Sequence, residues 1–229
     1  MKKSIFITLI ALSAFVVAVA GLSIAAGGQQ ASVSTSGGVI TIKGNETQKA
    51  AGIKLVEGVY VVRRTAGEGY IGITVNAADG TFVDGTFFND PNGTYMLAVM
   101  SHFIKPGGVI FEIKAYESWT LTVTKAEAAG AVALPQVLSS AEMTSAVSKP
   151  FKASAGKLTV SYTYKNGPKG VGGISICEIA TGMPLPVTSF MPAGKTSGSF
   201  TVDVAAAGIY VAQTNFPLGS GGGEIKIAQ

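Results

Sequence analysis

The sequence predicts an all-β protein of two tandem antiparallel β-sandwich domains, of jelly-roll or immunoglobulin-like type, after an N-terminal apolar helix. Apolar and polar residues alternate in short runs, and turn residues such as glycine, asparagine and proline separate the runs. The chain has 30 glycines and only 13% charged residues, which suits strands joined by tight turns. The order of the runs repeats at an offset of about 100 residues, which predicts a tandem duplication.

The first 26 residues predict export. Lys2 and Lys3 precede Ser4–Ala26, an uncharged and largely apolar run. A basic start, an apolar core and small residues form the layout of a signal peptide, and cleavage after Ala20 fits that layout. Kept uncleaved as a helix, the same run is long enough to cross a hydrocarbon core of about 30 Å. We therefore expect residues 1–26 to be a signal peptide or a membrane anchor, and the protein to be secreted, periplasmic or on the cell surface.

The charge of the chain predicts no nucleic-acid partner. The formal net charge is +4 at pH 7, but removing Lys2 and Lys3 from the 17 basic residues leaves 15 against 13 acidic ones. Nucleic-acid binding needs clustered lysine and arginine. The only adjacent arginines, Arg63 and Arg64, lie inside an apolar run.

Composition divides the rest of the chain into four parts. Residues 27–38, rich in serine, glycine and glutamine, are predicted to be a flexible spacer. Residues 39–125 and 149–229 are predicted to be the two sandwiches, joined by a linker, 126–148, in which Ala141–Val147 resembles a short capped helix. The predicted strands are Val39–Lys43, Ile53–Leu55, Gly58–Arg64, Ile71–Asn76, Thr81–Phe87, Tyr95–Ser101, Val109–Tyr116 and Trp119–Thr124, then Phe151–Ala153, Lys157–Tyr164, Gly173–Ile179, Val187–Phe190, Ser197–Val204, Gly208–Asn215 and Gly222–Ile227.

The repeated pattern resembles a known exported module. It is carried by glycines and alternating strands in both halves, at Gly58–Val62, Trp119–Val123, Phe151, Ala155–Val160 and Val204–Ile227. These segments are similar to jelly-roll β-sandwich modules of the pre-peptidase C-terminal type, which are appended to secreted bacterial and archaeal proteins. The resemblance implies a non-catalytic module that accompanies another domain or protein. Many such modules carry acidic residues in the middle strands, whereas the second half here has only Glu178 there.

The sequence lacks the usual catalytic sets, so we predict no enzyme activity and no cofactor. One histidine, His102, and one cysteine, Cys177, cannot build a multi-histidine zinc site or a thiolate cluster. Cys177 lies in an alternating strand, where we expect a small, half-buried side chain. Two alternatives stay open. A secreted hydrolase would need a deep pocket holding two or more of Asp79, Asp84, Glu112 and His102, and a structural calcium ion would need the oxygens of Asp79, Asp84 and Asp90.

Aromatic residues at predicted strand ends give the best argument for binding. Exposed rings of Tyr70, Tyr116 and Trp119 could stack on a sugar or anchor a protein partner. The competing interpretation is that they cap the core. The predicted function is a non-catalytic structural or interaction protein of the cell envelope or the extracellular space, with an envelope or extracellular protein or glycan as partner. The alternative is a secreted carbohydrate- or ligand-binding module that uses these rings.

Two further features concern modification and assembly. Asn45 and Asn92 each begin an Asn-x-Thr pattern and are predicted glycosylation acceptors in a host with the machinery. In an assembly variant of the interaction hypothesis, Gln29–Lys43 donates a strand to the sheet edge of a neighbouring molecule.

Overall fold

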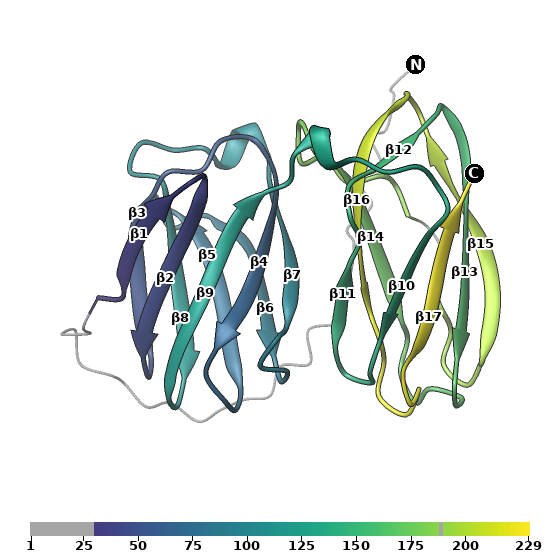
Figure 1. The fold of residues 1–229 in the computed structure, drawn as a ribbon, viewed down its shortest axis with the longest axis horizontal. Helices are drawn as coiled ribbons and strands as arrows, with labels where there is room; N and C mark the ends of the chain where they lie inside the picture. The colour runs from purple at the N-terminus through teal and green to yellow at the C-terminus, as the bar shows by residue number, and fades with distance from the viewer. Residues whose placement is uncertain (1–29, 188–189) are drawn as a thin grey trace, which may run out of the picture.

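A computed structural model describes residues 30–187 and 190–229 (Figure 1). Within these ranges the chain is all-β with antiparallel sheets, as the sequence predicts, and its only helices are two single 3-10 turns, Ser101–Phe103 and Ala128–Gly130. The same ranges contain no helix that is long and apolar enough to cross a membrane. The predicted signal peptide or anchor, residues 1–26, lies outside the described residues.

Nine strands form two sheets in the N-terminal half, residues 30–125. The first sheet has the order β1-β2-β9-β4-β7 and the second the order β3-β8-β5-β6. Alternation of buried and exposed residues along these strands gives each sheet one apolar face. The strands are β1 (Ser32–Ser36), β2 (Val39–Asn45), β3 (Gln48–Ile53), β4 (Gly58–Ala66), β5 (Ile71–Ala77), β6 (Phe82–Phe88), β7 (Thr94–Val99), β8 (Val109–Ala115) and β9 (Ser118–Lys125).

The C-terminal half, residues 126–229, also has two sheets. One has the order β10-β17-β13-β15, and in the other β16 pairs with β11 and β12 on one side and with β14 on the other. The strands are β10 (Gln136–Ser140), β11 (Ser145–Val147), β12 (Phe151–Ala153), β13 (Gly156–Tyr164), β14 (Gly173–Glu178), β15 (Ser197–Val204), β16 (Gly208–Asn215) and β17 (Gly223–Ala228).

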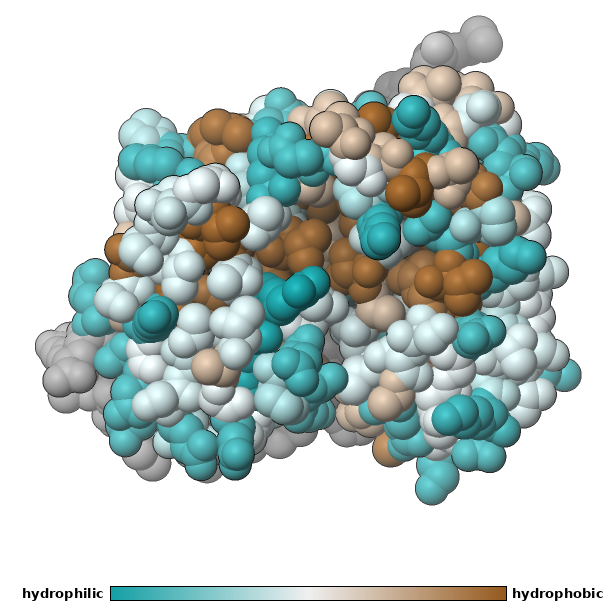
Figure 2. Space-filling model, viewed as in Figure 1, coloured by the Kyte–Doolittle hydropathy of each residue, from teal (hydrophilic) through white to brown (hydrophobic). Residues whose placement is uncertain are grey.

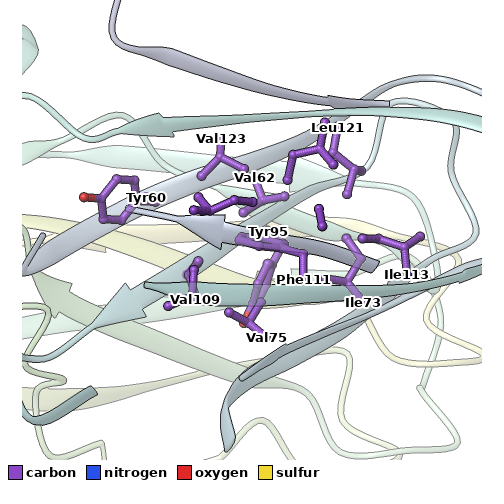
Figure 3. Close-up of a cluster of buried hydrophobic side chains, with 14 of the residues drawn as sticks. Tyr60, Val62, Ile73, Val75, Tyr95, Val109, Phe111, Ile113, Leu121 and Val123 are labelled. Carbon is purple, nitrogen blue, oxygen red and sulfur yellow. The ribbon is translucent and has the colours of Figure 1, made fainter. Parts of the chain in front are cut away.

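Each half encloses its own hydrophobic core. In the N-terminal half the core lies between the two sheets, and Figure 3 shows strands of both sheets contributing to it. Alternate residues of β5, among them Ile73 and Val75, point inward beside Ile113 and Phe111 of β8. The second core is built from inward residues of the C-terminal strands, including Phe151, Leu158, Val160, Ile176, Ile225 and Ile227.

A third apolar cluster joins the two halves, and we call it the seam. It consists of Val59, Met96, Cys177, Ile179 and Val211, from β4, β7, β14, the loop after β14, and β16. The backbone N–H of Val59 donates a hydrogen bond of 3.2 Å to the carbonyl of Ile179. Figure 2 shows other hydrophobic residues at the surface, gathered across the middle of one face over both halves, whereas the seam residues themselves are buried. The halves therefore meet through packed apolar side chains as well as through the connecting chain.

The seam also closes a sheet edge. β7 is the last strand of its sheet and pairs only with β4. Its backbone N–H at Met96 donates a hydrogen bond to the side-chain carbonyl of Gln213 in the C-terminal half. Exposed strand edges invite pairing with other chains. The C-terminal half thus protects this edge.

The predicted flexible spacer is wrong over Ser32–Ser36, which forms β1. β1 pairs with β2 through a turn at Gly37 and Gly38, both with positive φ, the conformation that two-residue hairpin turns require. All five β1 residues are exposed, so the strand shows no apolar alternation and its composition looks like a linker. β2 lies between β1 and β9, so Val39–Lys43 is paired within its own chain and is not free to be donated as a strand.

The predicted short helix at Ala141–Val147 is also wrong, because this segment is a turn followed by β11. Seven residues are too few for a helix to be stable by itself, where about 12–15 are needed. The Thr144 hydroxyl donates to the Ala141 carbonyl at 2.7 Å, which favours the turn. Upstream, β10 pairs with β17 and buries Leu138, so sheet pairing decides this region.

Two predicted strands differ locally. Only Ile53 of the predicted strand Ile53–Leu55 is a strand residue, at the end of β3. Val187–Phe190 includes two residues outside the described ranges, and its described ends, Val187 and Phe190, are not in a strand.

Candidate functional site

Three exposed aromatic side chains gather on the outer face of the β3-β8-β5-β6 sheet. They are Tyr70, just before β5, and Phe82 and Phe87 of β6, with 44%, 61% and 52% of their surface exposed. The rings of Tyr70 and Phe87 stack with centroids 5.8 Å apart and planes 27° apart. Ile71 and Ile73 face the core, so the residues between and before them face outward. We call Tyr70, Phe82 and Phe87 the aromatic strip.

Two glycines form the floor beneath the rings. A Cβ added at Gly72 would lie 3.4 Å from Tyr70 Oη and 3.5 Å from its Cε1. One added at Gly85 would lie 3.6 Å from Phe82 Cε2 and 3.1 Å from the Ile73 carbonyl oxygen. The ring of Tyr70 therefore lies over Gly72, and that of Phe82 over Gly85. Seated on backbone, both rings have less freedom than an ordinary exposed aromatic side chain.

Uncharged polar side chains border the rings. Thr74 pairs across the sheet with Gly85, and Asn76 pairs with Phe82. Both are half-buried, and neither side chain makes a hydrogen bond to any residue that the structure describes. Beyond them on β8, Glu112 is held by Lys49 of β3 at 2.6 Å. Next to the strip there are therefore a hydroxyl group and an amide group without hydrogen-bond partners among the described residues. The Lys49–Glu112 ion pair lies beyond them on the same sheet.

The three predicted stacking residues do not act as one group. Tyr70 belongs to the strip. Tyr116, 84% exposed, follows β8 at the same end of the sheet, because Ala115 pairs with Ile71, but no ring contact links it to Tyr70. Trp119 is only 2% exposed, and its indole N–H donates to the Glu46 carbonyl at 2.8 Å. Its ring is therefore not available to stack on a ligand.

Sequence reasoning missed Phe82 and Phe87. The signal that could have found Phe87 is its neighbour, since Phe87 and Phe88 are adjacent in an alternating strand. Successive side chains of a strand point to opposite faces, so burying Phe88 forces Phe87 outward. Phe82 had no comparable signal, because a register irregularity between Val75 and Asn76 shifts its pairing.

The proposed hydrolase residues lie in separate environments. Asp79 accepts the Thr81 N–H at 3.0 Å in an exposed turn, and the ring of His102 packs on Phe103 with centroids 4.0 Å apart. Glu112 pairs with Lys49, and Asp84 lies beside Tyr95 of β7. Two open depressions of about 720 and 440 Å³, one around Ala66–Glu68 and one between β10 and β11, are lined by none of the four candidates.

The glycosylation candidates are on the surface, whereas the calcium candidate Asp84 is largely buried. In the part of the chain that the structure describes, no three acidic, histidine or cysteine side chains come together in a way that could hold a metal ion. The Asp90 carboxylate accepts a hydrogen bond of 2.8 Å from the Asn92 N–H and so stabilises the turn in which Asp90 lies. Asn45 and Asn92 are both exposed, and Asn45 accepts a hydrogen bond from the Ser118 hydroxyl at 3.0 Å.

Near the seam, three titratable groups influence one another. Burial raises the pKa of Asp84, against the opposing effects of the Tyr95 hydroxyl and the Gly85 N–H. Burial, and then the charge of Asp84, raise the pKa of Tyr95 well above its usual value. No hydrogen bond of regular geometry joins the Tyr95 hydroxyl to any described residue. Burial therefore shifts the protonation equilibrium of Asp84 toward the neutral carboxylic acid, relative to an exposed aspartate.

Replacing Asp84 by asparagine should stabilise the protein only above about pH 4. The pKa of Asp84 in the folded protein is raised above the ordinary 3.8, so the folded state binds the proton more tightly than the unfolded chain does. The contribution of Asp84 to the free energy of unfolding is therefore largest below pH 3.8 and falls as the pH rises through the folded pKa. Asparagine does not titrate and keeps an oxygen for the Gly85 N–H. Urea unfolding midpoints at several pH values test this, with Asp203→Asn, at an exposed position of β15, as control. A gain that is equal at all pH values would contradict it.

Cys177 should resist alkylation in the folded protein. Burial, and then the charge of Asp84, raise the pKa of its thiol to about 12, so the reactive thiolate is scarce at neutral pH. We expect iodoacetamide to add no mass to the native protein and one adduct after unfolding in guanidinium. Labelling of the native protein as fast as that of the unfolded chain would show that the seam opens readily.

Comparisons with known proteins give no family for this chain. No protein-family model matches it, and no curated protein does. Among solved structures it is similar to a β-porphyranase of glycoside hydrolase family 86 from the human gut bacterium Bacteroides plebeius, at 12% identity and a TM-score of 0.21. That match covers 86% of this chain and only 36% of the porphyranase chain. Another match is the Lactobacillus farciminis oxalate decarboxylase formate complex, at 9% identity and a TM-score of 0.19, covering 86% of this chain and 83% of that one.

Proposed function

We propose that this protein is a non-catalytic, exported module of two tandem β-sandwich domains that attaches to a partner in the cell envelope or the extracellular space. The single observation that carries the attachment role is the aromatic strip. Isolated exposed apolar residues are normal, but grouped ones mark interaction sites on soluble proteins. Here three rings share one sheet face, and two of them lie over glycines.

Matching strand orders support the proposed duplication. The order β2-β9-β4-β7 in the N-terminal half has the counterpart β10-β17-β13-β15 in the C-terminal half. Likewise β3-β8-β5 corresponds to β12-β16-β14. The equivalent strands β4 and β13 both begin with a glycine of unusual backbone conformation, Gly58 at φ 135° and Gly156 at φ 130°. Two unrelated sandwiches would not be expected to share these details.

Export rests on the sequence pattern of residues 1–26. The intact mass of the protein recovered from its native host tests it. A mass that corresponds to a chain starting at Gly21 supports a released protein. A mass that corresponds to a chain still containing Ser4–Ala26 supports a membrane-tethered one. A protein found in the cytoplasm with its full mass would contradict export.

Sedimentation with insoluble envelope material from the source organism tests the attachment role. Wild-type protein should sediment with this material, and a triple variant with serine at Tyr70, Phe82 and Phe87 should stay in solution. Tyr116→Ser removes a ring outside the strip that is more exposed than any of the three, and this variant should sediment normally. Unchanged thermal midpoints would show that all proteins are folded. Equal sedimentation of the wild type and the triple variant would contradict the role of the strip.

A further inference from the structure

We infer that the aromatic strip binds an uncharged polysaccharide chain laid along β6. This inference rests on the proposed function, since it names the partner of the same surface. The shape of the strip is the first argument. Tyr70 and Phe82 lie over glycines on a sheet face, and Phe87 stacks beside Tyr70. A pyranose ring presents a face of C–H groups, which packs well against the apolar face of an aromatic ring.

The polar margin is the second argument. A sugar that stacks through its C–H face directs hydroxyl groups sideways. Thr74 and Asn76 stand beside the rings with one hydroxyl and one amide, which together offer donors and acceptors. Neither has a hydrogen-bond partner among the described residues, although both are half-buried. Ligand hydroxyls can satisfy these groups, whereas a lipid tail or a purely apolar surface would leave them without partners.

The size of the surface favours a thin, linear ligand over a protein. A stable protein interface takes about 20–30 residues on each side and centres on side chains that enter pockets. The strip offers three rings, two glycines and two polar side chains before the Lys49–Glu112 ion pair begins. The two depressions described above are lined by none of the strip residues. A single polysaccharide chain matches this narrow, shallow face.

The charge of the face favours an uncharged chain. Glu112 is neutralised by Lys49, and the residues that surround Phe82 and Gly85 across the sheet are Thr74, Asn76 and Ile110. Lys114, which pairs with Gly72, is the one unpaired charge on these cross-strand rows of the described structure. A single cation is too little for an acidic polysaccharide, whose repeated charges need clustered lysine or arginine.

The test is binding of the exported protein to purified polysaccharides. Cellulose, chitin, insoluble β-1,3-glucan and soluble xylan are the uncharged probes, hyaluronate and heparin the charged ones, and phosphatidylcholine vesicles the membrane probe. We expect at least one uncharged probe to bind, and Phe87→Ser and Phe82→Ser each to weaken binding about tenfold. Thr74→Val keeps the shape of the side chain without its hydroxyl and should weaken binding several-fold. Tyr116→Ser should bind like wild type.

The outcomes separate this inference from the proposed function. If the strip variants lose sedimentation with envelope material but no uncharged polysaccharide binds, the attachment role stands and the inference is wrong. If an uncharged polysaccharide binds equally to wild type and to the strip variants, the strip is not the site, and the inference is again wrong. Binding only to charged probes or vesicles would overturn it as well. Because Trp119 is buried, tryptophan fluorescence is a poor reporter here, so sedimentation and calorimetry are the readouts.

Discussion

Replacing Gly58 by alanine lowers the free energy of unfolding more than replacing Gly156 by alanine. Both glycines begin equivalent strands with φ near the same positive value, 135° and 130°. Alanine in such a conformation costs about 1–3 kcal/mol of backbone strain at either site. The surroundings differ. A Cβ at position 58 would lie 2.7 Å from the Ile179 carbonyl oxygen and 2.9 Å from Cε of the flexible Lys125 side chain. One at position 156 would meet only the flexible end of Gln229, 3.9 Å away.

The pair of variants isolates the contact between the halves. Gly156→Ala measures the backbone strain alone. The additional loss in Gly58→Ala, expected to be about 1–3 kcal/mol, measures the crowding of the loop at Ile179 against β4, because the end of the Lys125 side chain can move aside and a backbone carbonyl cannot. Urea unfolding followed by circular dichroism gives both values. Gly130→Ala is the control variant and should change stability little, since a Cβ there would meet nothing within 4 Å and the φ of Gly130 is not positive. Equal losses at Gly58 and Gly156 would show that Ile179 is not held against β4.

Strands buried on one face could be predicted closely from the sequence. The prediction Ile71–Asn76 differs by one residue from β5, and Val109–Tyr116 by one residue from β8. Their alternating apolar residues report burial directly. β1 could not be found in this way, because all five of its residues are exposed and only backbone hydrogen bonds to β2 define it. β10 and β11 were missed because pairing with β17 and β16 outweighs the local preference of an alanine-rich segment.

The candidate site was predicted in part, for similar reasons. Tyr70 could be identified because glycines precede it and a strand follows. The burial of Trp119 depends on Gly44 of β2, where a side chain would collide with the indole ring. That pairing of Gly44 with Trp119 joins residues far apart in the sequence, and no local pattern reports it. In the sequence alone, Gly72 and Gly85 look like residues that weaken a strand, because a glycine has no side chain to pack. The structure shows that aromatic rings lie over both of them.

Replacing Arg64 by methionine is expected to destabilise the protein by about 2–4 kcal/mol and to weaken binding at the strip. Arg64 is fully buried on the inner face of β4. Its guanidinium donates to the carbonyl of Gly69 at 2.6 Å and to the carbonyl of Glu68. Methionine has similar bulk but no donor, so both carbonyls would lose their partner. Arg64→Lys keeps the charge but cannot span both acceptors, and we expect an intermediate loss.

Arg64 affects the strip through the loop that its hydrogen bonds hold, because Tyr70 directly follows Glu68 and Gly69 in the chain. Gly67 and Gly69 in this loop have φ of 102° and 66°, so the loop has few local restraints of its own. A double-mutant cycle separates positioning from general destabilisation. Under conditions where all variants are folded, Arg64→Met should weaken binding in the wild-type background and should add no further loss once Tyr70 is serine. An equal loss in both backgrounds would mean that Arg64 acts on the whole sheet, and that the loop does not orient the first ring of the strip.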